Sequence, residues 1–161
     1  MKTHVLASIL EVPLAIHDVF EFFSAAANLE RITPPELRFS IAKVQPVLIR
    51  EGTIIDYRLG LYGLRFGWRS LISHWEPPHR FVDEQVKGPY ARWHHEHIFE
   101  ETEDGTRIRD TVEYSLPLYP AGEIALPLVR AQLRRIFTFR QKSVMRALGA
   151  NEQACRWDVR V

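Results

Sequence analysis

Hydrophobic and polar residues change their spacing twice along the chain. Residues 3–12 alternate as in a strand, and from Pro13 onward apolar residues recur at helical spacing. A second short helix is predicted at 24–31, and the paired prolines Pro34 and Pro35 end helical structure there. The chain is therefore predicted to begin with a strand followed by two helices.

A period of two begins at Leu37 and persists to residue 116. Glycine, proline and Asp-Gly sequences interrupt it at intervals that predict turns between antiparallel strands. An alternation of this length excludes a purely helical domain. Six strands fit the pattern, at 37–44, 53–61, 65–75, 81–86, 91–101 and 106–116.

One long helix is predicted to follow the strands, over residues 124–148. Apolar residues recur there at helical spacing, and Gly149 ends the pattern. Arg140 interrupts the apolar face, so its side chain either extends to solvent or offers a cation to an anionic group of a ligand. The other basic residues of the helix are expected on a solvated outer face rather than in a nucleic-acid site.

Length and composition indicate one domain. The chain has 161 residues, of which 46% are hydrophobic and 25% charged, and its formal net charge is +1. This charge argues against nucleic-acid partners and against binding to anionic membranes. We expect the domain to span residues 1–149 and residues 150–161 to form a tail without a recognisable element.

The single cysteine, Cys155, excludes an internal disulfide and a cysteine-rich zinc site, as is usual for a protein of the reducing cytosol. No apolar run approaches the roughly 20 residues that a membrane helix needs. We therefore expect a cytoplasmic protein without stable membrane insertion, either a monomer or a homodimer.

The densest group of histidines lies in the segment RWHHEHIFEE, residues 92–101. In a strand, Trp93, His95 and His97 share one face with Phe99, and the opposite face is polar. His95 and His97 are therefore predicted to point into the interior. On the partner strand, the side chains predicted to point to the same side are Asp110, Val112 and Tyr114.

Two further strands, 53–61 and 65–75, contribute aromatic residues to the same interior. A long sheet closed by one amphipathic helix can curl around that helix and leave a cavity, and small-molecule sites are usually concave and mostly apolar. We expect a cavity of roughly 300–1,000 Å³. The inward positions of the two strands include Tyr57, Leu59, Trp68 and Ile72.

The order of these elements and several local sequences resemble the START-type, birch-pollen-allergen-like helix-grip superfamily (SRPBCC). The chain is similar in particular to the bacterial branch called polyketide-cyclase-like or cell-division-inhibitor-like, and the resemblance extends to about residue 149. The residues that carry it most specifically are Trp68, Pro77, Pro78, Phe81, Gly88, Pro89, Trp93, His95, His97 and Phe99.

The resemblance implies an α+β fold of the order β-α-α-β6-α. A curved, seven-stranded antiparallel sheet would grip the long C-terminal helix around a hydrophobic tunnel. Because the superfamily includes lipid and hormone carriers as well as aromatase/cyclases, the resemblance does not choose between binding and catalysis.

The His-x-His pair raises the question of a metal site of the kind found in cupins. Glu101 has the matching parity, but the spacing from Gly88 and to Gly105 departs from the cupin pattern. A further ligand would have to come from a distant strand. We therefore expect a pair of pocket histidines held by hydrogen bonds, with no metal and no cofactor.

Asp110 is the carboxylate expected beside these histidines. A hairpin loop of four residues would place it opposite His97, and a loop of two residues would place it opposite Phe99 and diagonal to His97. The contact is either a buried hydrogen bond without further role or a general acid or base with its pKa tuned toward neutrality. The candidate catalytic residues are His95, His97, Asp110 and Tyr114.

The sequence thus predicts a non-catalytic binding or carrier protein for a small hydrophobic, aromatic or lipid-like molecule. The alternative is an enzyme of cyclase or dehydratase type, in which a pocket histidine transfers a proton and Tyr114 or Asp110 stabilises the developing charge. The predicted ligand-binding residues are Tyr57, Leu59, Trp68, Ile72, Trp93, His95, His97, Asp110, Val112, Tyr114, Leu133, Ile136 and Phe137.

Overall fold

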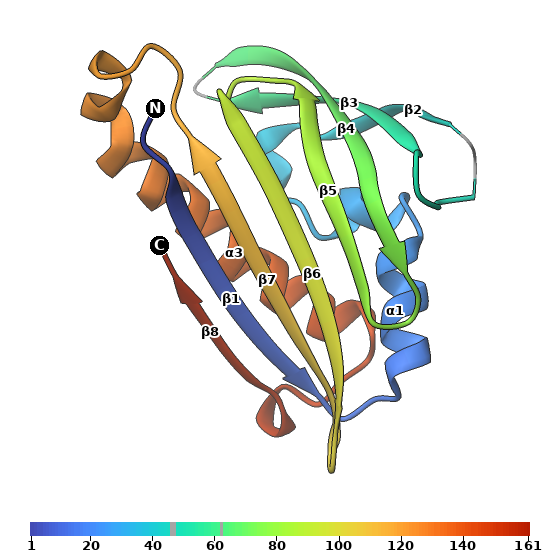
Figure 1. The fold of residues 1–161 in the computed structure, drawn as a ribbon. Coiled ribbons are helices and arrows are strands. Elements are labelled where there is room, and N and C mark those ends of the chain that lie inside the picture. The colour runs from blue at the N-terminus through green and yellow to red at the C-terminus, as the bar shows by residue number, and fades with distance from the viewer. Residues whose placement is uncertain (46–47, 62) are drawn as a thin grey trace.

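The computed structural model describes residues 1–45, 48–61 and 63–161, and it shows one antiparallel sheet curved around a long helix (Figure 1). The strands are ordered β2-β3-β4-β5-β6-β7-β1-β8 across the sheet. Their bounds are β1 His4–Val12, β2 Ser40–Gln45, β3 Ile54–Leu61, β4 Leu64–Glu76, β5 Arg80–Lys87, β6 Arg92–Thr102, β7 Gly105–Ser115 and β8 Arg156–Arg160.

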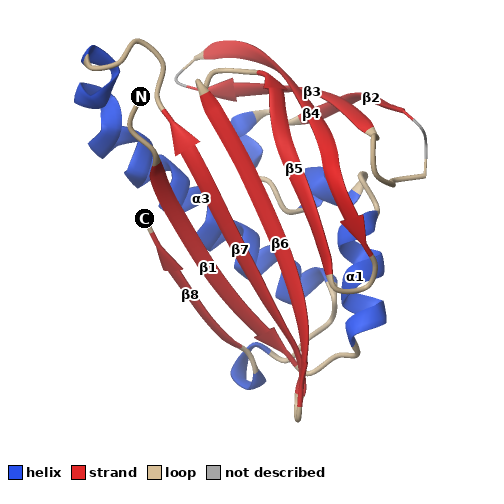
Figure 2. Cartoon of the chain, in the orientation of Figure 1, coloured by secondary structure: helices blue, strands red, loops and turns tan. Residues whose placement is uncertain are grey.

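The helices lie together on one face of the sheet (Figure 2). The long helix α3 crosses this face, and α1 covers it at the other end of the molecule. The α-helices are α1 Ile16–Ser24, α2 Asn28–Arg31 and α3 Leu126–Ala147, and short 3₁₀ helices are η1 Pro35–Leu37, η2 Ala121–Ala125 and η3 Glu152–Ala154. Within the described residues no helix is both long and apolar enough to cross a membrane.

The predicted α+β helix-grip architecture is confirmed, but the prediction of seven strands was wrong by one. The tail, for which no element was predicted, forms β8, and this strand pairs with β1 through the register Ala7 to Arg160. Its sequence RWDVRV alternates polar and apolar residues, and Val159 packs against the core cluster to which Leu6 belongs. A period of two over only six residues was too short to be recognised as a strand.

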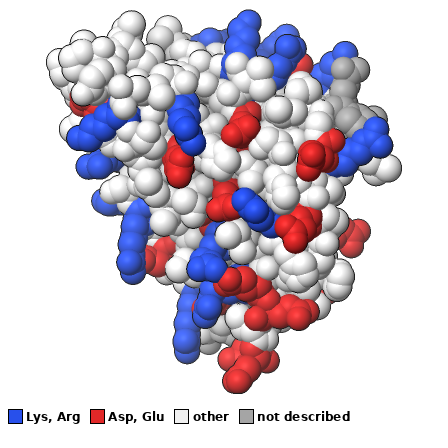
Figure 3. Space-filling model, viewed as in Figure 1, with Lys and Arg blue, Asp and Glu red and all other residues white. Residues whose placement is uncertain are grey.

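The core lies between the inner face of the sheet and the helices. The alternation predicted for residues 92–101 is present in β6, where His95, His97 and Phe99 are buried. The outer face carries ion pairs between neighbouring strands, such as Arg92 with Glu113, and Figure 3 shows acidic and basic side chains interleaved on it. Apolar side chains that point inward and paired charged side chains that point outward therefore define the two faces of the sheet.

The hairpin of β6 and β7 fixes the register at the histidines. His97 pairs with Asp110, as in the first of the two predicted alternatives. The strands extend as far as Thr102 and Gly105, however, so only two residues form the turn rather than the four expected for this register. Gly105 adopts a positive φ of 148°, and a Cβ there would lie 2.2 Å from the carbonyl oxygen of Val12, so the turn requires glycine.

Candidate functional site

A cavity lies between the helices α1, α2 and α3 on one side and the inner face of strands β3 to β6 on the other. Its volume is about 150 Å³, which is smaller than the predicted range. Large aromatic side chains explain the difference, because Tyr57 and Trp68 stack in its wall with ring centroids 5.7 Å apart, and Trp93 meets Trp68 edge-on at 5.2 Å. The space nevertheless resembles an engineered apolar cavity of about 150 Å³ that admits benzene.

Most of the predicted ligand-binding residues line this cavity, and three do not. Asp110, Val112 and Tyr114 lie on β7 and are buried outside the lining. Val112 and Tyr114 belong to a core cluster with Leu6 and Leu116, because β7 runs beneath α3 where no space remains. The predicted residues that line the cavity are Tyr57, Leu59, Trp68, Ile72, Trp93, His95, His97, Leu133, Ile136 and Phe137.

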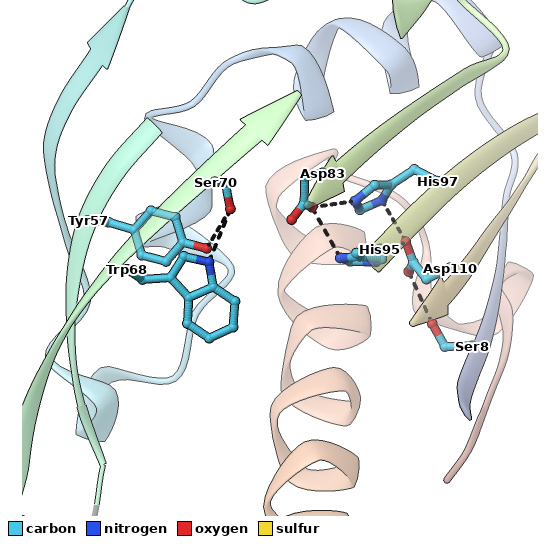
Figure 4. A network of polar contacts seen from close by, with 8 residues as sticks. All are labelled: Ser8, Tyr57, Trp68, Ser70, Asp83, His95, His97 and Asp110. Atoms are coloured by element: carbon cyan, nitrogen blue, oxygen red, sulfur yellow. Dashed lines mark hydrogen bonds and ion pairs between the residues drawn. The ribbon is translucent and has the colours of Figure 1, made fainter. Parts of the chain in front are cut away.

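One cluster of polar side chains in the cavity wall is centred on Ser70. Its hydroxyl is 3.1 Å from the hydroxyl of Tyr57, and it accepts a hydrogen bond of 3.1 Å from the indole Nε1 of Trp68 (Figure 4). Burial raises the pKa of Tyr57 well above its usual value, and nearby Asp83 adds to the rise. Tyr57 therefore presents a neutral hydroxyl at neutral pH, held in place by Ser70.

A second polar group joins β5, β6 and β7. The imidazoles of His95 and His97 contact each other, with ring centroids 3.8 Å apart and ring planes tilted by 37°, and Asp83 lies on one side of the pair and Asp110 on the other (Figure 4). Asp83 Oδ2 is 3.3 Å from His95 Nδ1 and 3.4 Å from His97 Nε2. The other two nitrogens face Asp110 Oδ1, at 3.3 Å from His95 Nε2 and 2.7 Å from His97 Nδ1.

The short contact of His97 Nδ1 with Asp110 is an ion-pair contact, since its angle does not satisfy a hydrogen bond. Behind Asp110 the polar chain continues away from the cavity. Ser8 donates a hydrogen bond of 3.1 Å to Asp110 Oδ2, and Gln141 of α3 donates one of 2.8 Å to Ser8. Asp110 is thus fixed from β1 and α3, and it contacts the cavity only through the two histidines.

These contacts shift the pKa values of the cluster. Burial raises the pKa of Asp110, but His97 and His95 outweigh burial and hold the pKa well below its usual value. The pKa of Asp83 is lowered in the same way, since its contacts with both histidines outweigh burial. Burial lowers the pKa of His95, but Asp110 and Asp83 together raise it above its usual value. The carboxylates are therefore ionised, and His95 is easily protonated.

The raised pKa of His95 predicts that the protein loses stability as the pH rises. The unfolded imidazole titrates near 6.5, so the stabilising contribution is fully present below that pH and is lost as the pH rises through the higher folded pKa. The free energy of unfolding therefore falls by at most about 1.4 kcal/mol for each unit of pH increase. Urea denaturation in EDTA between about pH 6 and 9 measures it. A His95→Gln variant should lack this slope, and an equal slope in both proteins would contradict the assignment.

Arg140 is the cation of the cavity wall. Its guanidinium carbon lies 5.0 Å from the centre of the Phe137 ring, and its Nε is buried without a hydrogen-bond partner. It forms no ion pair with any residue in the described part of the chain, in contrast to Arg135 on the same helix, which pairs with Glu36. Of the two predicted orientations of Arg140, the structure therefore shows the one that faces the cavity.

Asp83 and Gln141 were missed by the sequence analysis. Asp83 has the parity of the inward Phe81, so alternation within residues 81–86 carried the signal, but that strand was not assigned faces. Gln141 follows Phe137 by one helical turn and therefore lies on the buried side of α3. Glu101, considered as a metal ligand, is exposed near the end of β6.

Comparison with known proteins identifies the fold. No family model and no curated protein matches the sequence. Among solved structures, the aromatase/cyclase Zhui from Streptomyces sp. R1128 superposes with a TM-score of 0.73 at 13% identity, over 92% of this chain and 94% of that chain. The di-domain ARO/CYC BexL from the BE-7585A biosynthetic pathway gives 0.71 at 18% identity, over 92% of this chain and 51% of that chain.

Ara h 8.0201 shares the same architecture, with a TM-score of 0.59 and 14% identity over 89% of this chain and 99% of that chain. Each superposition covers about nine-tenths of this chain, whereas the sequence identities are only 13–18%. The protein therefore has the helix-grip fold, as the sequence resemblance predicted.

Proposed function

We propose that this protein binds a small, ring-containing hydrophobic molecule in the cavity between α3 and the sheet. The observation that carries the proposal is the cavity itself, which aromatic residues surround and whose polar groups are confined to a few defined positions. A volume of about 150 Å³ favours a ligand of one or two fused rings over a long lipid chain. The structural similarity to two proteins named as aromatase/cyclases, a name that implies action on ring-forming molecules, supports the binding of such a ligand.

Mass spectrometry of the natively purified protein tests this proposal. Gentle ionisation should preserve a complex, and denaturation should then release a compound whose mass and spectrum identify it. Quenching of the fluorescence of Trp68 and Trp93, which both line the cavity, should confirm rebinding. If no compound is released, and if a panel of one- and two-ring aromatic compounds fails to quench this fluorescence, the proposal is wrong.

The unpaired guanidinium of Arg140 predicts a preference for anionic ligands. An Arg140→Met variant keeps much of the apolar stem and removes the charge, so it should bind 2-naphthoate about 10–100-fold more weakly, the effect of losing a hydrogen bond to a charged group. Binding of the neutral 2-naphthamide should change little. Fluorescence titration of both compounds measures the difference. Equal losses for the two compounds would show that Arg140 acts only through packing.

A second candidate function is catalysis of the cyclase or dehydratase type. It is favoured by His95 and His97, which line the cavity and are each in contact with carboxylates. A His97→Gln variant separates the two functions once the ligand is known. If turnover is lost while binding is retained, the protein is an enzyme. If the wild-type protein returns the ligand unchanged after long incubation, the binding function stands alone.

A further inference from the structure

We propose that Asp83, His95 and His97 form a binding site for one divalent transition-metal ion of the zinc type, with a free coordination position toward the cavity. This inference differs from the expectation drawn from the sequence, which was that the pocket histidines bind no metal, with Glu101 as the carboxylate considered and set aside. The third ligand comes instead from the neighbouring strand β5, since Asp83 pairs with His95 across the sheet.

The two distances from Asp83 to the histidines match a tetrahedral coordination sphere. One oxygen of Asp83, one nitrogen of His95 and one nitrogen of His97 all lie within 4.8 Å of one another. Bonds of about 2.0–2.1 Å place the ligand atoms of a tetrahedral zinc ion about 3.3–3.4 Å apart. The contacts of Asp83 with the two imidazoles measure 3.3 and 3.4 Å, longer than the roughly 2.7–2.9 Å of a good charge-assisted hydrogen bond.

Asp110 occupies the place of an outer carboxylate. Histidines that bind metals usually present their second nitrogen to a carboxylate, which fixes the ring and increases its basicity. Here one carboxylate oxygen of Asp110 faces the second nitrogen of both His95 and His97. Asp110 is itself held by Ser8, so the imidazoles are oriented from behind before any ion binds.

Charge also favours a divalent ion at this position. Two carboxylates, Asp83 and Asp110, lie within one largely buried cluster, and the side chain of Asp110 is only 3% exposed. One divalent ion balances their two charges while both imidazoles stay neutral, which is the form in which histidine binds metals. The bound ion would thereby compensate the buried negative charge of the two carboxylates, with no cationic side chain needed from elsewhere in the protein.

The position of the group leaves room for one more ligand. Asp83, His95 and His97 all line the cavity, whereas Asp110 does not. Three protein ligands with an open fourth position are typical of zinc sites that bind water or substrate, as opposed to closed structural sites. An oxygen atom of a bound molecule could therefore complete the coordination sphere. The metal site itself does not depend on the identity of that molecule.

Titration of tag-free, EDTA-treated protein with Co²⁺ and Zn²⁺ tests the site. We expect one equivalent of Co²⁺ to give the visible absorption of a tetrahedral N/O site and Zn²⁺ to displace it. Asp83→Asn and His97→Gln should each weaken binding by more than the roughly 10–100-fold expected for loss of an outer partner, and Asp110→Asn should weaken it by about that smaller factor. Circular dichroism confirms that each variant is folded.

His94→Gln is the matched control, because His94 neighbours His95 on β6 but pairs with Glu84 outside the cluster. Its binding should equal that of the wild-type protein. Imidazole ¹⁵N shifts of the wild-type protein need no variant, and Zn²⁺ should shift Nδ1 of His95 and Nε2 of His97. The site is disproved if no equivalent binds, or if binding survives in Asp83→Asn and His97→Gln. Neither outcome affects the binding of organic ligands to the cavity.

Discussion

Replacement of Asp110 by Asn should lower the free energy of unfolding by about 3–5 kcal/mol, the usual cost of removing one partner of a buried ion pair. Asn has nearly the shape of Asp, so packing is preserved and the loss reports on charge. The variant leaves His95 and His97 without the carboxylate that faces both rings, and Ser8 loses a charged acceptor. Urea denaturation in EDTA measures the loss as a lower midpoint at an unchanged slope.

Glu113→Gln provides the control on the same strand. Glu113 pairs with Arg92 at 2.9 Å on the outer face, where both side chains are more than two-fifths exposed. An exposed pair contributes about 0–1 kcal/mol, so this variant should remain close to the wild-type protein. Similar small losses for both variants would mean that Asp110 is not the anion that neutralises the buried histidines.

Ile136→Trp should abolish ligand binding, with affinity reduced at least about 100-fold, or about 2.7 kcal/mol. Ile136 is half-buried on α3 and lines the cavity. An indole ring at this position would occupy much of a space of only about 150 Å³ and leave no room for another ring. Overpacking should cost only about 1–3 kcal/mol of stability, so the protein should still fold. Titration with 2-naphthoate measures the loss.

Leu128→Trp places the same side chain elsewhere on α3 and serves as the control. Leu128 is 54% exposed and lies outside the cavity lining, so binding should not change. This control removes the added tryptophan fluorescence as an explanation. If Ile136→Trp still binds 2-naphthoate like the wild-type protein, the ligand site is not this cavity.

The fold was largely predictable because its signals are local and repeated. Alternation over residues 37–116 required a long antiparallel meander, and the helical spacing over 124–148 required one amphipathic helix to cover it. Each element agrees with its neighbours, so an error of a residue or two at an end does not change the topology. The strand β8 was missed because it is short and pairs with β1, a partner far away in the sequence.

The site was only partly predictable, because alternation gives the face of a residue but not its depth. His95 and Asp110 point to the same side of the sheet, yet only His95 reaches the cavity. Where α3 packs directly on β7, an inward residue such as Tyr114 becomes core. The volume of the cavity was overestimated for a related reason, since the rotamers of Trp68 and Trp93 decide how much space remains.

The position of β1 has a consequence for synthesis of the chain. His4 pairs with Tyr114 and Ala7 pairs with Arg160, so the first strand lies between two of the last. Ribosomes add about 5–20 residues per second, so β1 waits roughly 5–20 s before β7 has been made. During this time its apolar side chains and strand edges have no partner and are open to chaperones or to association with other chains. Ser8 lies on this strand, so its contact with Asp110 can form only after that wait.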